Sequence, residues 1–221
     1  IEMFLIDDGS TDGLKDVYEL YKIRFEKRGY SINYIYQKNQ GQSAAINKGL
    51  KLINGEYLIW PDSDDWFKSD IAIEYFVHAL EGCDESYGVV RCEPTYVNED
   101  GSSEVKCLEY STEPYQFRNC LYYDRFFWGA GNYMVKVESL DKTILYRDIY
   151  IAKNAGQNWQ LLLPVLYYYN CLTLSESFYS VLERKDSHSR GLYAATLESQ
   201  LLKIQSYEDT IIATLNKIEM D

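Results

Sequence analysis

Hydrophobic residues follow two alternating spacings in the first part of the chain. Short apolar or alternating runs, which are typical of strands, occupy residues 1–6, 32–36 and 57–60. Between and after them, apolar residues recur every three or four positions, which predicts helices over residues 12–25, 43–53 and 73–80. Because strands alternate with helices, the pattern predicts an α/β fold with a mostly parallel central sheet and helices on both faces.

The pattern changes after about residue 87, where strands follow one another more closely. Strands are predicted at residues 87–97, 104–110, 127–137 and 172–182. The segment Asn98-Glu99-Asp100-Gly101 is a typical hairpin turn between the first two. A helix is expected over residues 158–169, with an interruption at Pro164. This half is therefore expected to form a smaller, antiparallel part of the fold.

A helical extension is predicted over residues 191–221, after a main domain of residues 1–190. Its apolar positions have near-heptad spacing, broken by Glu208: Leu197, Leu201, Ile204, Ile211, Leu215 and Ile218. A lone helix could not keep such a stripe in water. It is expected to pack either on its own domain or against a second copy, and the heptad spacing favours a homodimer.

Composition limits the classes of partner. The 221 residues fit one domain with an appendage, and 22 basic against 34 acidic side chains give a net charge of -12. This charge opposes binding to nucleic acid and to anionic membranes. The five cysteines show no C-x-x-C spacing, so neither a zinc site nor a disulfide framework is indicated, and a cytoplasmic location fits. No signal peptide or apolar run near ~18 residues is present.

Two acidic turns directly follow predicted strands. Asp62, Asp64 and Asp65 come after the strand at 57–60, and Asp7-Asp8-Gly9 follows the strand at 1–6. Open α/β sheets bind ligands at the carboxyl ends of their strands, and carboxylates at i and i+2 can share one hard divalent cation. The alternative for each turn is a polar cap of the following helix.

These turns resemble known sequences when a third segment is included. Residues 7–12, 39–49 and 62–65, in this order and spacing, resemble the family 2 glycosyltransferases, which have the GT-A fold. The resemblance is good over residues 1–70 and loose over 120–190. It implies a nucleotide-diphospho-sugar transferase that passes a sugar to an acceptor hydroxyl with inversion. It also implies that a first strand-helix unit is missing before Ile1.

The resemblance carries further expectations about partners. The cofactor would be Mn²⁺ or Mg²⁺, the donor of uridine type, and the acceptor a glycan or a lipid-linked acceptor of surface polysaccharide synthesis. The antiparallel half would face this acceptor, and a lipid-linked acceptor would bring a cytoplasmic enzyme to the membrane periphery. No Q-x-x-R-W motif is present, so transfer of single sugars is expected rather than processive synthesis.

Donor and metal residues follow from the resemblance. It implies that Asp7, Asp8 and Gly9 contact the nucleotide base of the donor, with Asp7 slightly preferred over Asp8. It also implies that Gln42 binds the donor. Asp64 and Asp62 would hold the metal, and Asp62 would also contact the donor. Relatives often carry a basic residue near Ile46 that contacts the donor. Because this chain has none there, donor binding is expected to depend more on the metal. In the late loop, His188 would complete the metal shell and Arg190 would hold a phosphate, unless this loop is simply solvated.

The catalytic base is the least defined part of the predicted site. Where relatives carry an acid pair, this chain has Gln157 and Asn158, and an amide cannot take a proton at neutral pH. Both are expected to bind sugar hydroxyls. Asp148 is the nearest upstream acid and a candidate base, with an ordinary surface acid as the alternative. Trp66, Trp128 and Trp159 would either stack on sugars or belong to the core.

Two other functions stay open at this stage. A nucleotidyltransferase also binds metal through paired acids. A catalytically degenerate GT-A module, which binds nucleotide or glycan without transfer, would explain the amides at Gln157 and Asn158.

Overall fold

A computed structural model of the chain describes residues 1–104, 109–184 and 196–218. The strands are β1 (Glu2–Asp7), β2 (Ser31–Tyr36), β3 (Tyr57–Leu58), β4 (Trp66–Phe67), β5 (Tyr87–Asn98), β6 (Ser103–Glu104), β7 (Tyr133–Lys136) and β8 (Asn170–Glu183). The α-helices are α1 (Leu14–Lys27), α2 (Gln42–Leu50), α3 (Ala72–Glu81), α4 (Phe117–Tyr122), α5 (Val137–Thr143), α6 (Gln157–Tyr168) and α7 (Leu197–Leu215). Short 3₁₀ turns precede β7 and follow α5.

Most strands belong to one mixed sheet in the order β3-β7-β5-β8-β4, with β6 paired to β5. The strands β3, β5 and β8 run in one direction, because β5 pairs parallel with β8 while β7 is antiparallel to both β3 and β5. The strand β4 is antiparallel to β8, so the expectation of a mostly parallel central sheet is wrong for this sheet. The alternation of strands and helices correctly predicts that β1 and β2 are parallel. It does not predict that β7 lies between β3 and β5 and runs antiparallel to both.

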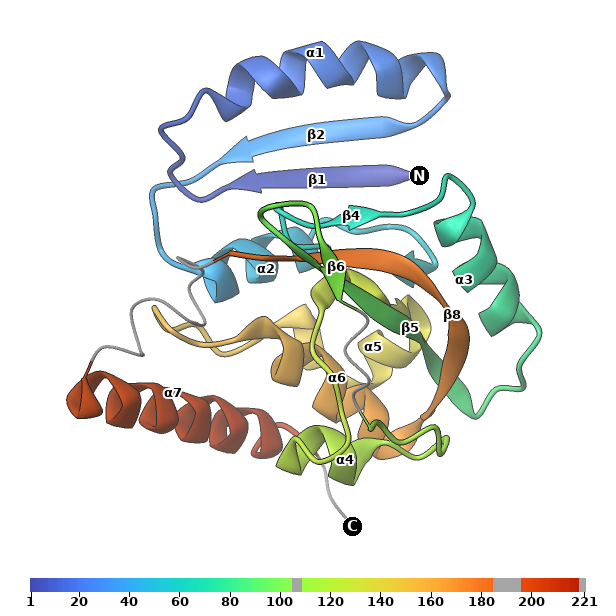
Figure 1. The fold of residues 1–221 in the computed structure, drawn as a ribbon, viewed down its shortest axis with the longest axis vertical. Coiled ribbons are helices and arrows are strands. Elements are labelled where there is room, and N and C mark those ends of the chain that lie inside the picture. The colour runs from blue at the N-terminus through green and yellow to red at the C-terminus, as the bar shows by residue number, and fades with distance from the viewer. Residues whose placement is uncertain (105–108, 185–195, 219–221) are drawn as a thin grey trace.

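Helices cover both faces of this sheet, as predicted. Successive residues of β5 and β7 point to opposite sides: Val89 and Val135 belong to one core cluster, and Val90 and Met134 to the other. The first cluster is completed by α5 and α6, and the second by α3 (Figure 1). Side chains that alternate along a strand are therefore buried on both faces, over residues 88–92 of β5, where even Arg91 is fully buried.

The N-terminal lobe, β1-α1-β2, forms a separate layer. β1 and β2 pair in parallel as a two-stranded sheet under α1 (Figure 1). α1 buries none of its residues fully. At the start of β1, the Glu2 carboxylate accepts hydrogen bonds from the backbone N–H groups of Asn54 (2.5 Å) and Gly55 (2.9 Å), just before β3. Polar contacts thus help to hold this lobe to the rest of the chain.

The sequence did not predict α4 and α5. These helices have six and seven residues, which is too short for a 3.6-residue period to be recognised. Pro164 does not interrupt α6, which continues through it from Gln157 to Tyr168. The hairpin from β5 to β6 is present, but its predicted second strand extends into residues 105–108, which lie outside the described part of the chain.

α7 packs on α6 with a face that is partly polar. Thr210 and Thr214 are buried, and the Tyr207 ring meets the Trp159 ring edge-on, with centroids 5.0 Å apart. Of the predicted apolar stripe, Leu215 and Ile218 reach the core, whereas the members from the first half of α7, Leu197, Leu201 and Ile204, stay exposed. Self-packing thus accounts for the C-terminal part of the stripe. None of the described helices combines the length and the apolar character that crossing a membrane requires.

Candidate active site

The acidic turn after β3 is tied to two other segments, the start of α2 and the end of β8. Asp62 accepts a hydrogen bond from Gln42 Nε2 (3.0 Å), at the first residue of α2. Asp64 forms a 2.6 Å ion pair with Arg184, which directly follows β8. Asp65 accepts from the backbone N–H of Leu182 (2.8 Å). The pairing of β4 with β8 brings this turn to the end of β8. The carboxylates thus follow β3, and two of their partners, Leu182 and Arg184, lie at the end of β8.

These carboxylates repel one another. Burial raises the pKa of Asp62 to about 6, and the neighbouring charges of Asp65 and Asp64 add to the rise. Burial also raises the pKa of Asp65 to about 6, with a further contribution from Asp64, although the Leu182 N–H acts in the opposite direction. A cation placed between these groups would relieve both the burial and the repulsion. The turn is therefore electrostatically suited to a positive ligand.

The donor set fits a hard divalent cation. Mg²⁺ is commonly bound through one or two carboxylates together with phosphate oxygens and water, and Asp62 and Asp64 offer such a pair. Within residues 1–104, 109–184 and 196–218, no group of three or more His, Cys, Asp or Glu side chains is arranged to hold a metal by itself. A ligand such as a diphosphate would have to complete the coordination. The predicted residues His188 and Arg190 lie outside the described part.

The other acidic turn holds its own loop together. The buried Asp7 accepts from the Ser10 N–H (2.7 Å) and from the Tyr34 hydroxyl. The Tyr34 hydrogen bond is the main cause that lowers the pKa of Asp7, and it raises the pKa of Tyr34 to about 12. Gly9 has a positive φ of 86°, and a side chain there would meet the Asn39 backbone at 3.0 Å. Glycine is therefore required where this turn meets the next loop.

Asp8 connects the first turn to the segment before α2. Its carboxylate accepts from Gln37 Nε2 (2.7 Å) and from the N–H groups of Gln40 (2.9 Å) and Gly41 (2.8 Å). Gln42, the next residue, then reaches Asp62. The structure thus brings together all three sequence segments on which the predicted donor site rests. The sequence could not reveal that Asp8 has a structural role, because its partners lie about thirty residues away.

The amides at the start of α6 lie beside the acidic turn. Asn158 Oδ1 accepts from the Trp60 indole Nε1–H (3.0 Å), and Trp60 is two residues before Asp62. Gln157 is 4% exposed. Trp159 donates from its indole to the carbonyl of Cys120 (3.0 Å) and packs in the core. The bond to Trp60 therefore places Asn158 beside the segment that leads into the acidic turn, with Gln157 next to it on α6 and Trp159 directed away into packing.

Asp148 lies elsewhere. Its carboxylate accepts from Asn47 Nδ2 (3.2 Å) and pairs with Lys51 (3.0 Å), which lowers its pKa. Asn47 lies in the second half of α2 and Lys51 directly follows the helix, whereas Gln42 at its start contacts Asp62, and nine residues of helix span about 13 Å. The structure does not bring Asp148 to the acidic turn.

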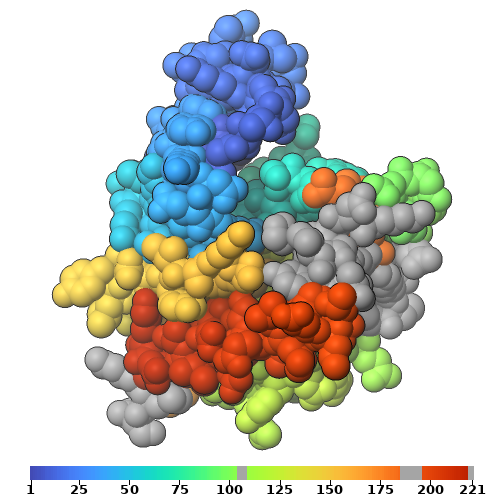
Figure 2. Space-filling view, turned by 90° about the vertical axis from the view of Figure 1, so that its left-hand side faces the viewer, coloured from blue at the N-terminus to red at the C-terminus, as the bar shows by residue number. Residues whose placement is uncertain are grey.

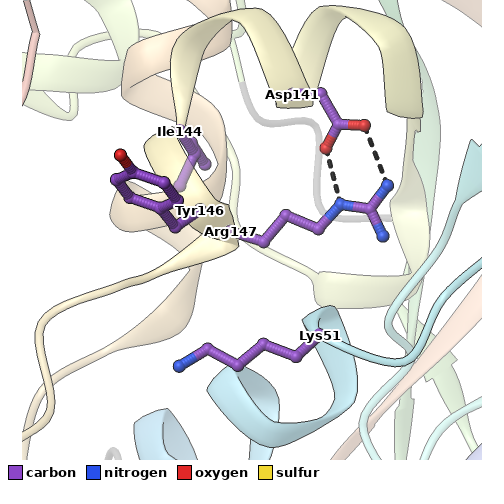
Figure 3. A pocket seen from close by; sticks show the side chains of 5 residues that line it. All are labelled: Lys51, Asp141, Ile144, Tyr146 and Arg147. Carbon is purple, nitrogen blue, oxygen red and sulfur yellow. Dashed lines mark hydrogen bonds and ion pairs between the residues drawn. The ribbon is translucent and has the colours of Figure 1, made fainter.

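An open hollow nearby has a structural explanation. It is lined by Lys51, Asp141, Ile144, Tyr146 and Arg147 (Figure 3). Arg147 binds Asp141 through Nε (2.6 Å) and Nη2 (2.8 Å), and its Nη1 donates to the Ile53 carbonyl (2.6 Å). These bonds join α5 to the end of α2, and none of the residues that line the hollow belongs to the acidic turns or to the start of α6.

Arg184 is a site residue that sequence reasoning missed. The only available signal was a basic residue directly after the last predicted strand, and many surface arginines have that position. Its partner Asp64 is 120 residues away in sequence, so only the fold reveals the ion pair.

The chain is similar to known proteins in sequence and in fold. Residues 1–143 match the family described as Glycosyl transferase family 2. EpsH of Bacillus subtilis is 39% identical over 70 residues, which cover 32% of this chain and 19% of EpsH. The matched part is thus about a fifth of that relative.

Two solved structures share the fold at low sequence identity. S. aureus TarS 1-349, in complex with UDP-GlcNAc, has a TM-score of 0.62 at 16% identity, covering 98% of this chain and 60% of that one. The mannosyltransferase PcManGT from Pyrobaculum calidifontis, in complex with GDP-Man and Mn²⁺, has a TM-score of 0.58 at 14% identity, covering 98% and 54%. The GT-A fold predicted from the sequence is confirmed.

Proposed function

Because the chain belongs to glycosyl transferase family 2, we propose that it transfers a sugar from a nucleotide-diphospho-sugar to an acceptor, with inversion and with a divalent cation. The observation that carries this proposal is the acidic turn: Asp62 and Asp64 are crowded carboxylates that follow the half-buried strand β3, and Asp62 is bound by Gln42. The biological setting that we propose is synthesis of a surface polysaccharide or lipid-linked glycan.

The donor would lie across the three joined segments. We assign Asp62 and Asp64 to Mn²⁺ or Mg²⁺, which when bound neutralises charge on the leaving diphosphate. Arg184 would exchange its ion pair with Asp64 for a phosphate oxygen. His188 and Arg190 remain proposed ligands of the metal and of a phosphate.

The nucleotide base of the donor would be bound by the loop that Asp7 and Asp8 hold together. Both carboxylates already accept hydrogen bonds from neighbouring groups. We therefore propose that they mainly shape the pocket, with a remaining lone pair of Asp7 available to a base N–H. A uridine-type donor is our first choice, since TarS was solved with UDP-GlcNAc, and GDP-mannose, found with PcManGT, is the second.

Titration calorimetry with UDP-GlcNAc and GDP-mannose, with and without Mn²⁺, tests this function. We expect binding of at least one donor that requires Mn²⁺ and is lost in Asp64→Asn, because a neutral amide is a weaker ligand for a hard cation. Asp70→Asn is a matched control on an exposed residue. Equal metal-independent affinities in all three proteins would refute the proposal.

A second candidate is a GT-A module that binds a donor without transferring its sugar. The observation in its favour is the pair of amides at Gln157 and Asn158. The calorimetry would be followed by a measurement of UDP release over time. Metal-dependent donor binding with no release, in the presence or absence of acceptor sugars, would favour the binding module over the transferase.

A further inference from the structure

The N-terminus of α6 carries unused hydrogen-bond donors. The first N–H groups of a helix have no acceptor within the helix. Here the N-cap is Gly156, without a side chain to accept them, and the first turn contains no acid. In the described ranges, no side chain or loop carbonyl accepts from the N–H groups of Gln157, Asn158 or Trp159. The positive end of the helix dipole is therefore uncompensated.

Gln157 adds a buried amide without a partner. Its side chain is 4% exposed and makes no hydrogen bond to any other described residue. It is not among the fully enclosed polar groups that lack a partner, so the little exposure it retains includes the amide. Side chains of an α-helix lean towards its N-terminus, which directs this first residue of α6 to the same place as the free N–H groups. A buried amide with no partner indicates a ligand.

Asn158 and Lys153 extend the donor set. The bond from Trp60 to Asn158 Oδ1 fixes that amide, which leaves its Nδ2 donors for another acceptor. Lys153 is exposed in the loop before α6, and no carboxylate of the described chain pairs with it. This loop, the yellow segment in Figure 2, lies between α2 above and α7 below. Backbone N–H groups, amide N–H groups and a lysine ammonium at a helix N-terminus together favour an anionic ligand.

We infer that the acceptor presents an ionised phosphate or carboxylate oxygen to the N-terminus of α6. The inference rests on the proposed function and names the class of acceptor. Neither Gln157 nor Asn158 can remove a proton from a hydroxyl, and an ionised oxygen has none to lose. This oxygen forms the new bond to the anomeric carbon of the donor sugar. The bond from that carbon to the diphosphate breaks, and the nucleoside diphosphate leaves with the electron pair.

The test uses inorganic phosphate as the probe, followed by phosphorus NMR without divalent metal. We expect saturable binding that Gln157→Glu and Asn158→Asp each weaken at least tenfold, because a carboxylate repels the anion. Because Gln157 is buried, a carboxylate there also costs desolvation, so thermal unfolding of each variant is measured beside binding, and the half-buried Asn158 gives the cleaner variant. The control Asn33→Asp makes the same charge change on β2 and should leave binding unchanged.

Two further arms separate the possible outcomes. Methyl β-glucuronide, followed by proton NMR, shows whether a carboxylate is preferred to a phosphate, and binding of either supports the inference. Failure of both anions to bind, or equal binding by Asn158→Asp, would overturn it. UDP-GlcNAc binding with Mn²⁺ is measured on the same proteins. If it persists in Asn158→Asp while anion binding is lost, both proposals hold; if the donor never binds, only the proposed function fails.

Discussion

The N-terminal lobe and the α6 core are stabilised by different interactions. Eight residues of α6 are buried, seven of them in the continuous run 160–166, whereas α1 buries none and exposes Val17, Leu20 and Ile23. The lobe is connected to the rest through carboxylates, among them Asp8 with its three donors. Apolar burial therefore dominates where the amides of the proposed acceptor site are anchored, and hydrogen bonding dominates where the donor base would bind.

This difference predicts how the molecule opens. Regions with little buried apolar surface unfold locally at a lower free energy than the core. The lobe should therefore open before the sheet and α6, and its opening should depend on charge. A donor that binds to both the lobe and the acidic turn would suppress this opening, because it stabilises the closed state to which it binds.

The largest expected effect is in the core. Leu163→Ala removes a side chain that is 0% exposed and should lower the free energy of unfolding by about 2–5 kcal/mol. Leu20→Ala, at a residue that is 58% exposed on α1, should change it by less than about 0.5 kcal/mol. Urea unfolding followed by circular dichroism compares the two. Equal losses would contradict the contrast between lobe and core.

Asp8→Asn should have a smaller, local effect. The amide keeps one acceptor oxygen but replaces the other by a donor, so the bonds from Gln40 and Gly41 cannot all be kept. We expect faster hydrogen exchange at those two N–H groups, by about tenfold, with exchange in α6 unchanged. Asp12→Asn, at an exposed residue of the same loop, is the control. Faster exchange throughout the protein would show that lobe and core open together.

Acid should act on the lobe through Asp7. Its pKa is lowered in the folded chain, chiefly by the Tyr34 hydroxyl, so its ionised form stabilises the fold above the ordinary value of 3.8. That stabilisation is lost as the pH falls below 3.8 and through the lowered pKa. Tyr34→Phe should therefore move the acid opening of the lobe to higher pH, as seen by hydrogen exchange in β1. An unchanged midpoint would show that Asp7 does not control it.

The smallest effect on stability is expected on α7. Leu201→Ser changes an exposed side chain and should alter the stability of the monomer by less than about 0.5 kcal/mol. If the exposed half of α7 forms the proposed homodimer, the same change should weaken it. Sedimentation velocity over a range of concentrations measures this. A native chain that stays monomeric at all of them would exclude the homodimer.

The sequence predicted where helices and strands lie along the chain better than it predicted which of them are in contact. Local periodicity placed β1, α1, β2 and α2, because each has its own apolar pattern. It could not predict that β7 lies between β3 and β5 and runs antiparallel to both, since strand order depends on contacts between residues that are far apart in sequence. For the same reason, the acidic turn was recognised but its partners Arg184 and Leu182 were not. Position along the chain makes Asp148 a candidate base, whereas in the fold its carboxylate pairs with Lys51.

Manganese binding tests the central claim most directly. Free Mn²⁺ gives a strong electron paramagnetic resonance signal that is lost on binding. With UDP-GlcNAc present, the native chain should remove this signal in a saturable manner, whereas a chain with both Asp62→Asn and Asp64→Asn should leave it at the level set by UDP-GlcNAc alone. Identical signals from the two proteins, with GDP-mannose as well as with UDP-GlcNAc, would contradict the assignment of the acidic turn to the metal and its donor.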